Sequence, residues 1–204
     1  MKKYALILAV ILVLAAWGIA AAETPHQVGP FILNHDIAQF SKFVHMDTAL
    51  PIRHIESIQE VEIKPIMGFK SGLIAYGTCA VSNRIVRIKL KYSDDSKTFY
   101  EKLKKRIDTR FGKSNEYRGD PFHIVIGWKW SFVDQDKQNI SLILQHNTRY
   151  EDEKMGNSIK LSMTSLIQSE RECHYKGMGK SLTDAGNSEP LVLEQSGWNL
   201  FVPR

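Results

Sequence analysis

A strict alternation of apolar and polar residues predicts a β-strand near the middle of the chain, over residues 86–92. The apolar positions are Val86, Ile88, Leu90 and Tyr92. The positions between them are basic: Arg87, Lys89 and Lys91. A period of two is typical of a strand with one buried face and one face in solvent. This strand is therefore expected to lie in a sheet whose second face is wet and positively charged.

The next stretch, residues 97–111, has the period of an amphipathic helix. Its apolar side chains recur at every fourth position, as Phe99, Leu103, Ile107 and Phe111. Residues 93–96 (Ser-Asp-Asp-Ser) are suited to a turn and an N-cap, and Gly112 is suited to the end of a helix. We expect this helix to pack its apolar face on the sheet.

The same reasoning predicts the remaining elements. Short helices are expected over residues 36–44 and 166–175, and polar loops over 47–51 and 113–122. Further strands are expected over 57–63, 73–81, 123–133, 139–146 and 158–165. The order α-βββ-α-βββ predicts an α+β fold, an antiparallel sheet of about six strands with one long and one or two short helices packed on one face. The other face is left open to solvent or to partners.

The N-terminal residues 1–22 have the features of a bacterial secretory signal peptide. Lys2 and Lys3 form a positive start, residues 4–22 carry no charge, and residues 20–22 (Ala-Ala-Ala) are small, so cleavage is expected before Glu23. Retention of the segment as a membrane anchor is the alternative, because the apolar run is long enough to span a bilayer. Residues 23–175 are expected to form a single α+β domain. Residues 176–204 are expected to form a flexible tail, with a C-terminal apolar segment that docks on the domain.

Charge and cysteine content narrow the possible partners and compartment. The net charge is +5, and removal of Lys2 and Lys3 with a segment that has no acidic residue leaves +3. This mildly basic balance falls short of that of a nucleic-acid-binding protein. The chain has two cysteines, Cys79 and Cys173. In the periplasm or outside the cell such a pair is expected to form a disulfide, worth roughly 4–5 kcal/mol in the chain-entropy model. Two buried free thiols are the alternative.

No motif in the sequence predicts a catalytic, cofactor-binding or metal-binding site. The seven histidines are scattered, without the i, i+4 or i, i+2 spacing of metal ligands, and no Cys-x-x-Cys is present. Trp128 and Trp130 lie in phase on a predicted strand, and this favours a place in the core over a stacking platform for a sugar or a base. A hydrolase would need the fold to bring His123 or His146 beside a carboxylate and a hydroxyl group.

The strongest local charge feature is basic. Arg87, Lys89 and Lys91 on the predicted strand are followed by basic residues of the predicted helix, namely Lys102, Lys104, Lys105 and Arg106. One hypothesis is a surface that binds an anionic partner. The other is a solvated face whose charges are matched in part by Glu60 and Glu62 across a neighbouring strand.

These observations predict a periplasmic or secreted protein without an enzymatic activity, a binding module. Its partner is expected to be a protein or an anionic component of the cell envelope. Nucleic acid is not expected, nor is the membrane once the signal segment is cleaved. An envelope-acting hydrolase is the alternative function, and a membrane-anchored structural protein is the alternative if residues 1–22 are retained.

Overall fold

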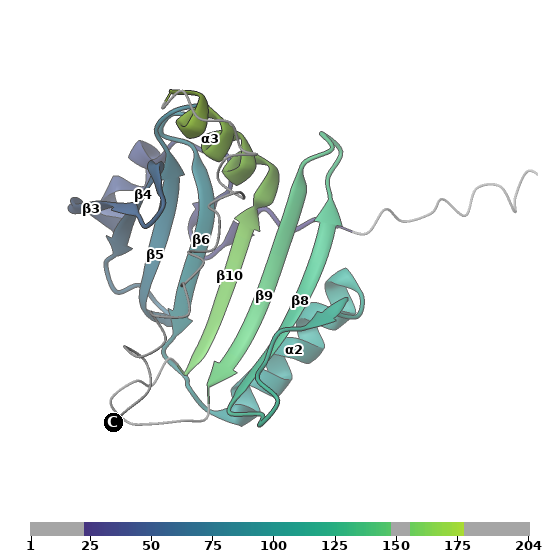
Figure 1. The fold of residues 1–204 in the computed structure, drawn as a ribbon. Helices are drawn as coiled ribbons and strands as arrows, with labels where there is room; N and C mark the ends of the chain where they lie inside the picture. Colours follow the sequence, from purple (N-terminus) through teal and green to yellow (C-terminus); the bar gives the residue numbers. More distant parts are fainter. Residues whose placement is uncertain (1–22, 148–155, 178–204) are drawn as a thin grey trace, which may run out of the picture.

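The structure is a computed structural model, and it describes residues 23–147 and 156–177 (Figure 1). The helices are η1 (Ile37–Phe43, a 3-10 helix), α2 (Lys97–Phe111) and α3 (Thr164–Gly177). The strands are β1 (Gln27–Val28), β2 (Phe31–Ile32), β3 (Val44–Ile52), β4 (Ile55–Ile63), β5 (Phe69–Gly77), β6 (Ile85–Tyr92), β7 (Glu116–Tyr117), β8 (Val125–Val133), β9 (Asn139–Asn147) and β10 (Asn157–Met163).

One large antiparallel sheet organises this part of the chain. Its eight described strands run in the order β3-β4-β5-β6-β10-β9-β8-β7, while β1 and β2 form a separate hairpin. The two halves of the chain meet where β6 pairs with β10, with Leu90 opposite Ile159 and Ile88 opposite Leu161. The α+β class and the antiparallel sheet predicted from the sequence are confirmed.

The predicted number of strands is wrong, because two edge strands were not expected. Strand β3 covers residues predicted to end a helix and to form a loop. Its pairing with β4 shifts between His45 and Leu50, and the Thr48 hydroxyl fills the gap by accepting the Glu62 N–H and donating to the His45 carbonyl. Such an irregular strand has no clean alternation to detect. Strand β7 is only two residues long and lies in the stretch predicted as a polar loop.

The main core lies between the sheet and a layer made of α2, η1 and the β1–β2 hairpin. Ser96 caps α2 by accepting the Phe99 N–H, and Tyr100 and Ile107 are the helix residues that are buried. Leu103 is only half-buried against this core. The indole N–H of Trp130 donates to the Gly112 carbonyl at 2.9 Å and so fixes the end of the helix to the sheet.

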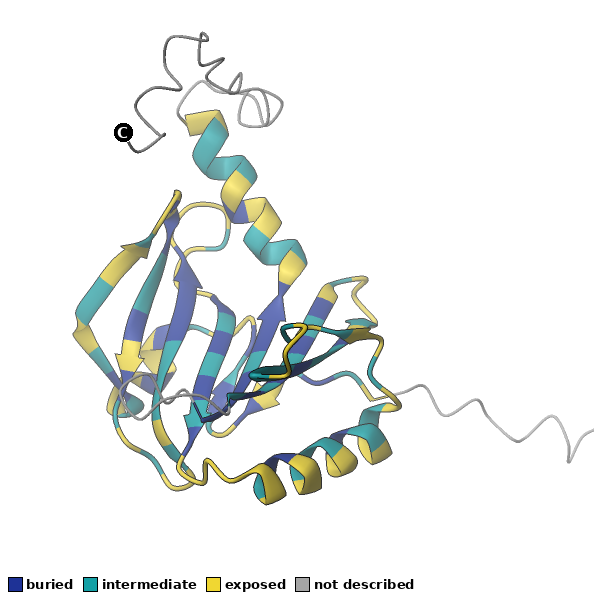
Figure 2. Ribbon diagram, turned by 60° about the horizontal axis from the view of Figure 1, so that its bottom comes forward, coloured by how far each residue is buried: buried dark blue, intermediate teal, exposed yellow. Residues whose placement is uncertain are grey.

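Helix α3 packs on the opposite side of the sheet from α2, as Figure 2 shows. Beneath it lies a second, smaller core that contains Ile55, Ile58 and Val86, with Ile167 of the helix packed against them. The prediction that the helices share one face is therefore wrong. The alternation predicts Val86 and Ile88 on the same face of the strand, but their side chains lie on opposite faces. The reason is a register shift between β5 and β6, which inserts one residue at this point.

Two sequence predictions lie outside the described residues. The signal peptide covers residues 1–22, and most of the predicted tail is residues 178–204. No helix of the described part is both long and apolar enough to cross a membrane.

Candidate anion-binding face of the sheet

The candidate site is the side of the sheet that carries α3 at one end and that no other helix of the described residues covers. We call its cations the basic face. They are Arg87, Lys89 and Lys91 of β6, Arg118, Lys129 of β8 and Lys160 of β10. Lys89 lies directly opposite Lys160, and Ile143 of β9 lies between Lys160 and Lys129. Residues in such a row share one face of a sheet, so strands from both halves of the chain supply the basic face.

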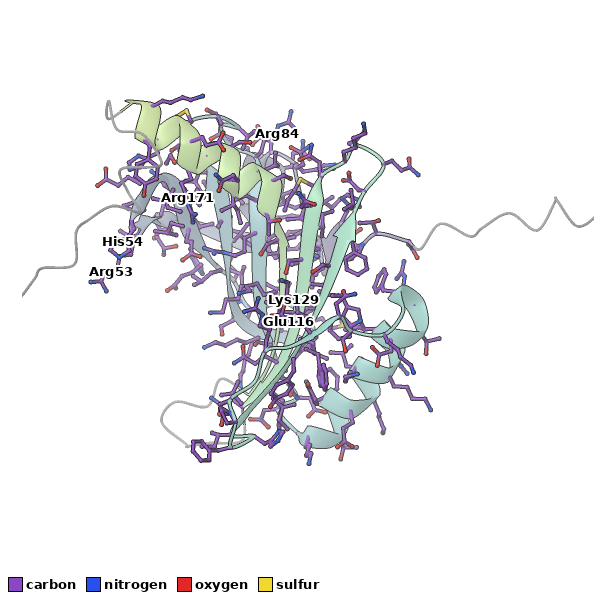
Figure 3. All side chains as sticks on the ribbon, turned by 45° about the vertical axis from the view of Figure 1, so that its right-hand side comes forward. Arg53, His54, Arg84, Glu116, Lys129 and Arg171 are labelled. Atoms are coloured by element: carbon purple, nitrogen blue, oxygen red, sulfur yellow. A yellow bond between two sulfur atoms is a disulfide. The ribbon has the colours of Figure 1, made fainter. Side chains whose placement is uncertain are left out.

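Part of this positive charge is neutralised by glutamates of β4 and β7. Arg87 donates to the Glu60 carboxylate at 2.8 Å, and both side chains are one-quarter exposed. At the other edge, Glu116 pairs with Lys129 at 3.2 Å and with Arg118 at 2.9 Å. Figure 3 labels Glu116 and Lys129, whose strands form this edge of the sheet. The predicted cross-strand pairing is thus confirmed for Glu60.

The lysines in the middle of the face have no such partner. Lys89, Lys91 and Lys160 form no ion pair with any residue of 23–147 or 156–177. Glu62, predicted to balance the stripe, lies opposite Leu73 and likewise makes no ion pair within this part of the chain. The excess positive charge is therefore concentrated at the centre of the sheet, at the junction of β6 and β10.

Lys160 experiences this excess most strongly. Its side chain is half-buried, and it faces Lys89 across the strand pair. Burial, together with the positive charges of Arg87, Lys89, Arg118 and Lys129, lowers the pKa of the Lys160 ammonium. Like charges placed directly opposite in a sheet are destabilising. A bound anion would relieve this unfavourable arrangement.

Small hydroxyl side chains form the floor between the lysines. Ser158 and Ser162 flank Lys160 on the same face of β10 and lie opposite Lys91 and Arg87. Both serines are almost completely buried as residues, but their hydroxyl groups make no hydrogen bond to another described residue. Beside the cations, the two hydroxyl groups thus have no hydrogen-bond partner within residues 23–147 and 156–177.

A pocket of about 370 Å³ adjoins this floor on the β5 side. Its lining combines two of the unpaired lysines with polar and apolar residues of β4 and β5, and consists of Glu62, Ile63, Ser71, Gly72, Leu73, Lys89 and Lys91. Lys89 belongs both to the pocket and to the row that contains Lys160. The pocket and the hydroxyl floor are thus one continuous surface.

The basic residues of α2 do not belong to this surface. The helix packs on the other side of the sheet, where Lys102, Lys105 and Arg106 line a separate shallow site. Lys104 is bound to Asp108 at 2.6 Å and lies over the Trp128 ring. The basic stripe that is continuous in the sequence is therefore divided between two sides of the molecule.

The aromatic and histidine candidates have other surroundings. Trp130 is buried, which confirms its predicted place in the core. His146 is also buried, and its Nδ1 lies 2.7 Å from Asn157 Oδ1. His123 is exposed, and its Nδ1 lies 3.0 Å from the Tyr117 hydroxyl. Within the described residues no group of three or more His, Cys, Asp or Glu side chains is arranged to hold a metal ion.

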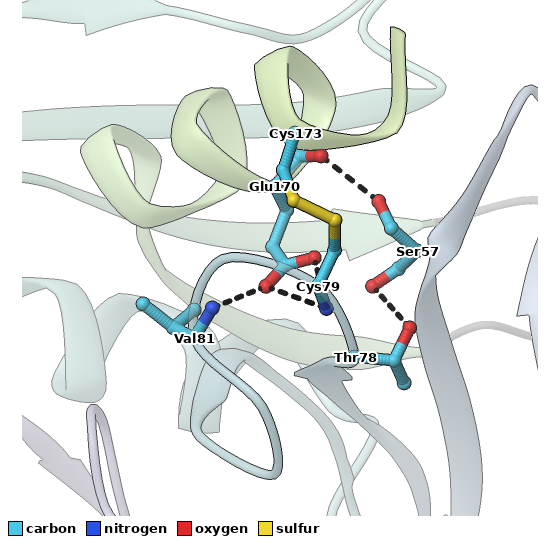
Figure 4. Close-up of a disulfide and its surroundings, with 6 residues drawn as sticks. All are labelled: Ser57, Thr78, Cys79, Val81, Glu170 and Cys173. Atoms are coloured by element: carbon cyan, nitrogen blue, oxygen red, sulfur yellow. Dashed lines mark hydrogen bonds between the residues drawn. A yellow bond between two sulfur atoms is a disulfide. The ribbon is translucent and has the colours of Figure 1, made fainter. Parts of the chain in front are cut away.

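A disulfide holds α3 to the sheet beside the basic face. Cys79 follows β5 and is bonded to Cys173 of α3, with their Cα atoms 6.0 Å apart (Figure 4). This pairing confirms the prediction made from the two cysteines. The loop after β5 and the helix are brought together across 94 residues of sequence.

Sequence reasoning missed the buried carboxylate next to this bond. Glu170 is completely buried, and it accepts N–H bonds from Val81 at 2.7 Å and from Cys79 at 3.0 Å (Figure 4). Its carbonyl also accepts the Ser57 hydroxyl at 3.0 Å. The available signal was its position three residues before Cys173, on the same side of the predicted helix.

The comparisons with known proteins add no relationship to this geometry. No model of a known protein family matches the chain, and comparisons with curated proteins and with solved structures return no significant match. The class that the structure defines is an α+β protein, an antiparallel sheet with a helix on each side.

Proposed function

We propose that this protein is a secreted or periplasmic binding module without enzymatic activity, and that its basic face binds an anionic component of the cell envelope. The observation that carries the proposal is the placement of Lys89 directly opposite Lys160 on adjacent central strands. Neither lysine has an acid partner among the described residues. A stable sheet gains nothing from two unneutralised like charges at its centre, whereas an anion-binding site requires them.

The surroundings of the lysines support recognition by charge and hydrogen bonding. The Ser158 and Ser162 hydroxyls lie beside the cations and have no other described partner. Such groups bind anions without making or breaking a covalent bond. The disulfide supports the proposed compartment, because disulfides persist in oxidising environments and are rare in the cytosol.

The proposal is tested by measuring binding of the protein to dextran sulfate and to uncharged dextran by surface plasmon resonance at physiological salt. The test variant is the double substitution Lys89→Gln and Lys160→Gln. The matched control is Lys102→Gln with Lys105→Gln, which removes the same charge from exposed positions of α2. Both variants have the same net charge, so a difference between them reports the site rather than overall electrostatics.

The wild-type protein and the α2 variant are expected to bind dextran sulfate, and the basic-face variant is expected to lose most of that binding. Equal weakening in both variants would show that net charge alone is responsible and would refute the proposal. Absence of binding by the wild-type protein would also refute it.

A further inference from the structure

Resting on the proposed function, we infer that residues 184–202 of this chain cover the basic face in the unliganded protein, so that an anionic ligand binds by displacing them. We call these residues the acidic segment. They lie outside the described part of the structure, whose last residue is Gly177. The basic face is then a site that the protein itself regulates.

The centre of the basic face is a mixed surface of cations and aliphatic side chains. In the row across the sheet, Lys89 and Lys160 lie between Leu73 of β5 and Ile143 of β9. Leu73 and Ile143 are half-buried, and among the described residues neither belongs to the main core or to the smaller core. A small anion would neutralise the lysines and leave the two aliphatic side chains in water. An occupant with both carboxylates and aliphatic side chains satisfies the whole row.

The acidic segment has this composition. It contains three acidic residues, Asp184, Glu189 and Glu194, and no basic residue. The apolar residues 190–193 (Pro-Leu-Val-Leu) lie between the two glutamates. The segment therefore offers one stretch of chain in which carboxylates flank aliphatic side chains. Its charge is opposite to that of the unpaired lysines, and complementary charge favours correct pairing of two surfaces.

Helix α3 directs the chain to the correct side of the sheet. The helix lies on the same side as the basic face, and Ser57 of β4 donates a hydrogen bond to the Glu170 carbonyl at 3.0 Å. Cys173, one turn further along, is fixed to Cys79 by the disulfide. The chain therefore leaves the described part beside the basic face, at the end of the sheet where Figure 1 shows α3.

The length of chain is sufficient to reach the lysines. An extended chain spans about 3.3 Å per residue, so residues 178–188 can bridge roughly 35 Å before Glu189 is reached. A strand of nine residues, such as β4, is about 30 Å long. A short flexible tether also gives the attached segment a local concentration in the millimolar range, so weak individual contacts are sufficient to hold it.

Carbodiimide cross-linking of the full chain tests the contact directly, because the reagent joins a carboxylate to an ammonium group only where the two are close. Mass spectrometry is expected to find Glu189 or Glu194 joined to Lys89 or Lys160. The exposed lysines of α2, on the other side of the sheet, are the internal control. Equal cross-linking to the α2 lysines would overturn the inference. A yield that rises with protein concentration would also overturn it, because the contact would then join two copies of the chain.

The double substitution Glu189→Gln and Glu194→Gln in the full chain tests the regulation. It removes two carboxylates from the acidic segment, so dextran sulfate is expected to bind about fivefold more tightly than to the wild-type protein. The matched control is Glu101→Gln with Asp136→Asn, which removes the same charge from exposed positions of the described part. It is expected to change the affinity by less than about twofold, because these charges are remote and screened by salt.

Methyl NMR signals of Leu73 and Ile143 are expected to shift in the acidic-segment variant and to stay in place in the control, and circular dichroism checks that both are folded. Equal affinities of the two variants for dextran sulfate would overturn the inference while the proposed anion-binding function stands. Cross-links to the basic face without dextran sulfate binding by any of the proteins would refute the proposed function and leave the acidic segment as the occupant of the face.

Discussion

Replacement of Glu170 by glutamine tests how α3 is held on the sheet. In the native protein this buried carboxylate accepts the Val81 N–H through Oε1, and the Cys79 N–H through both of its oxygens. The substitution preserves shape but removes the charge and turns one acceptor into an NH₂ donor. The remaining oxygen can serve Val81, and the Cys79 N–H then faces another donor in a buried position.

The expected cost follows from these contacts. A buried donor left without a partner costs about 1–3 kcal/mol, and loss of the charge weakens the remaining bond to Val81. Removal of a buried charge returns part of this free energy, because the carboxylate no longer has to be desolvated. We expect a net decrease of about 2 kcal/mol in the free energy of unfolding of Glu170→Gln. For a chain of this length that corresponds to a fall in Tm of about 4–8 °C.

Urea denaturation followed by circular dichroism measures the change under oxidising conditions, with thiol titration to verify that the disulfide is intact. Glu172→Gln is the matched control, because it makes the same chemical change two residues further along the same helix, on a half-buried side chain whose described hydrogen bond is to Gln168. It is expected to change stability by less than about 0.5 kcal/mol. If Glu170→Gln unfolds at the same urea concentration as the wild-type protein, the carboxylate does not hold the Cys79 loop and this reasoning is wrong.

The remaining predictions concern other parts of the fold. Cys79→Ser with Cys173→Ser is expected to lower the free energy of unfolding by about 4 kcal/mol, because the bond closes a long loop; reduction of the wild-type protein should reproduce the loss, and an unchanged urea midpoint would contradict it. Lys160→Gln is expected to raise the free energy of unfolding at pH 7 by up to about 1 kcal/mol, since it removes a like-charge contact. The pKa of Lys160 is lowered in the folded state, so between the folded pKa and the ordinary lysine pKa the unfolded chain binds more protons than the folded chain. The free energy of unfolding of the wild-type protein should therefore rise with pH in that interval, and the extra stability of Lys160→Gln should shrink. Urea denaturation at a series of pH values measures both changes. Ile107→Ala on the buried side of α2 is expected to cost about 2–4 kcal/mol in the same urea assay, and a cost below 1 kcal/mol would contradict the packing of that helix. Mass spectrometry of protein isolated from its native envelope is expected to find Glu23 as the first residue, whereas Met1 or Met1-derived peptides would support the retained anchor.

The repeating patterns of the sequence predicted most of the regular elements correctly. Strand β6 and helix α2 lie where alternation and four-residue spacing placed them, and the six central strands follow the predicted order along the chain. These elements are long and have one buried face, so burial imposes a period that local sequence records. Strand β3 was not predicted because its bulge interrupts the period, and β7 because two residues define no period.

The candidate site was predicted only in part. Arg87, Lys89 and Lys91 are adjacent in the pattern of one strand, and the sequence was sufficient to indicate their shared wet face. Lys160 was not identified, because its importance comes from pairing with Lys89 across two strands that are far apart in the chain. The basic residues of α2 were wrongly grouped with those of β6, since proximity along the chain does not determine on which side of a sheet a helix packs.

The sequence by itself determined most of the regular elements, the buried and wet sides of most strands, and the cysteine pair that forms the disulfide. The elements and their buried sides follow from local periodicity, and the disulfide follows because the chain has two cysteines. Only the tertiary structure decided that α2 and α3 lie on opposite sides of the sheet, that Glu170 caps the loop at Cys79, and that Lys89 and Lys160 face each other. Each of these depends on strand order and register, which arise from contacts between distant segments and leave no periodic signal in the chain.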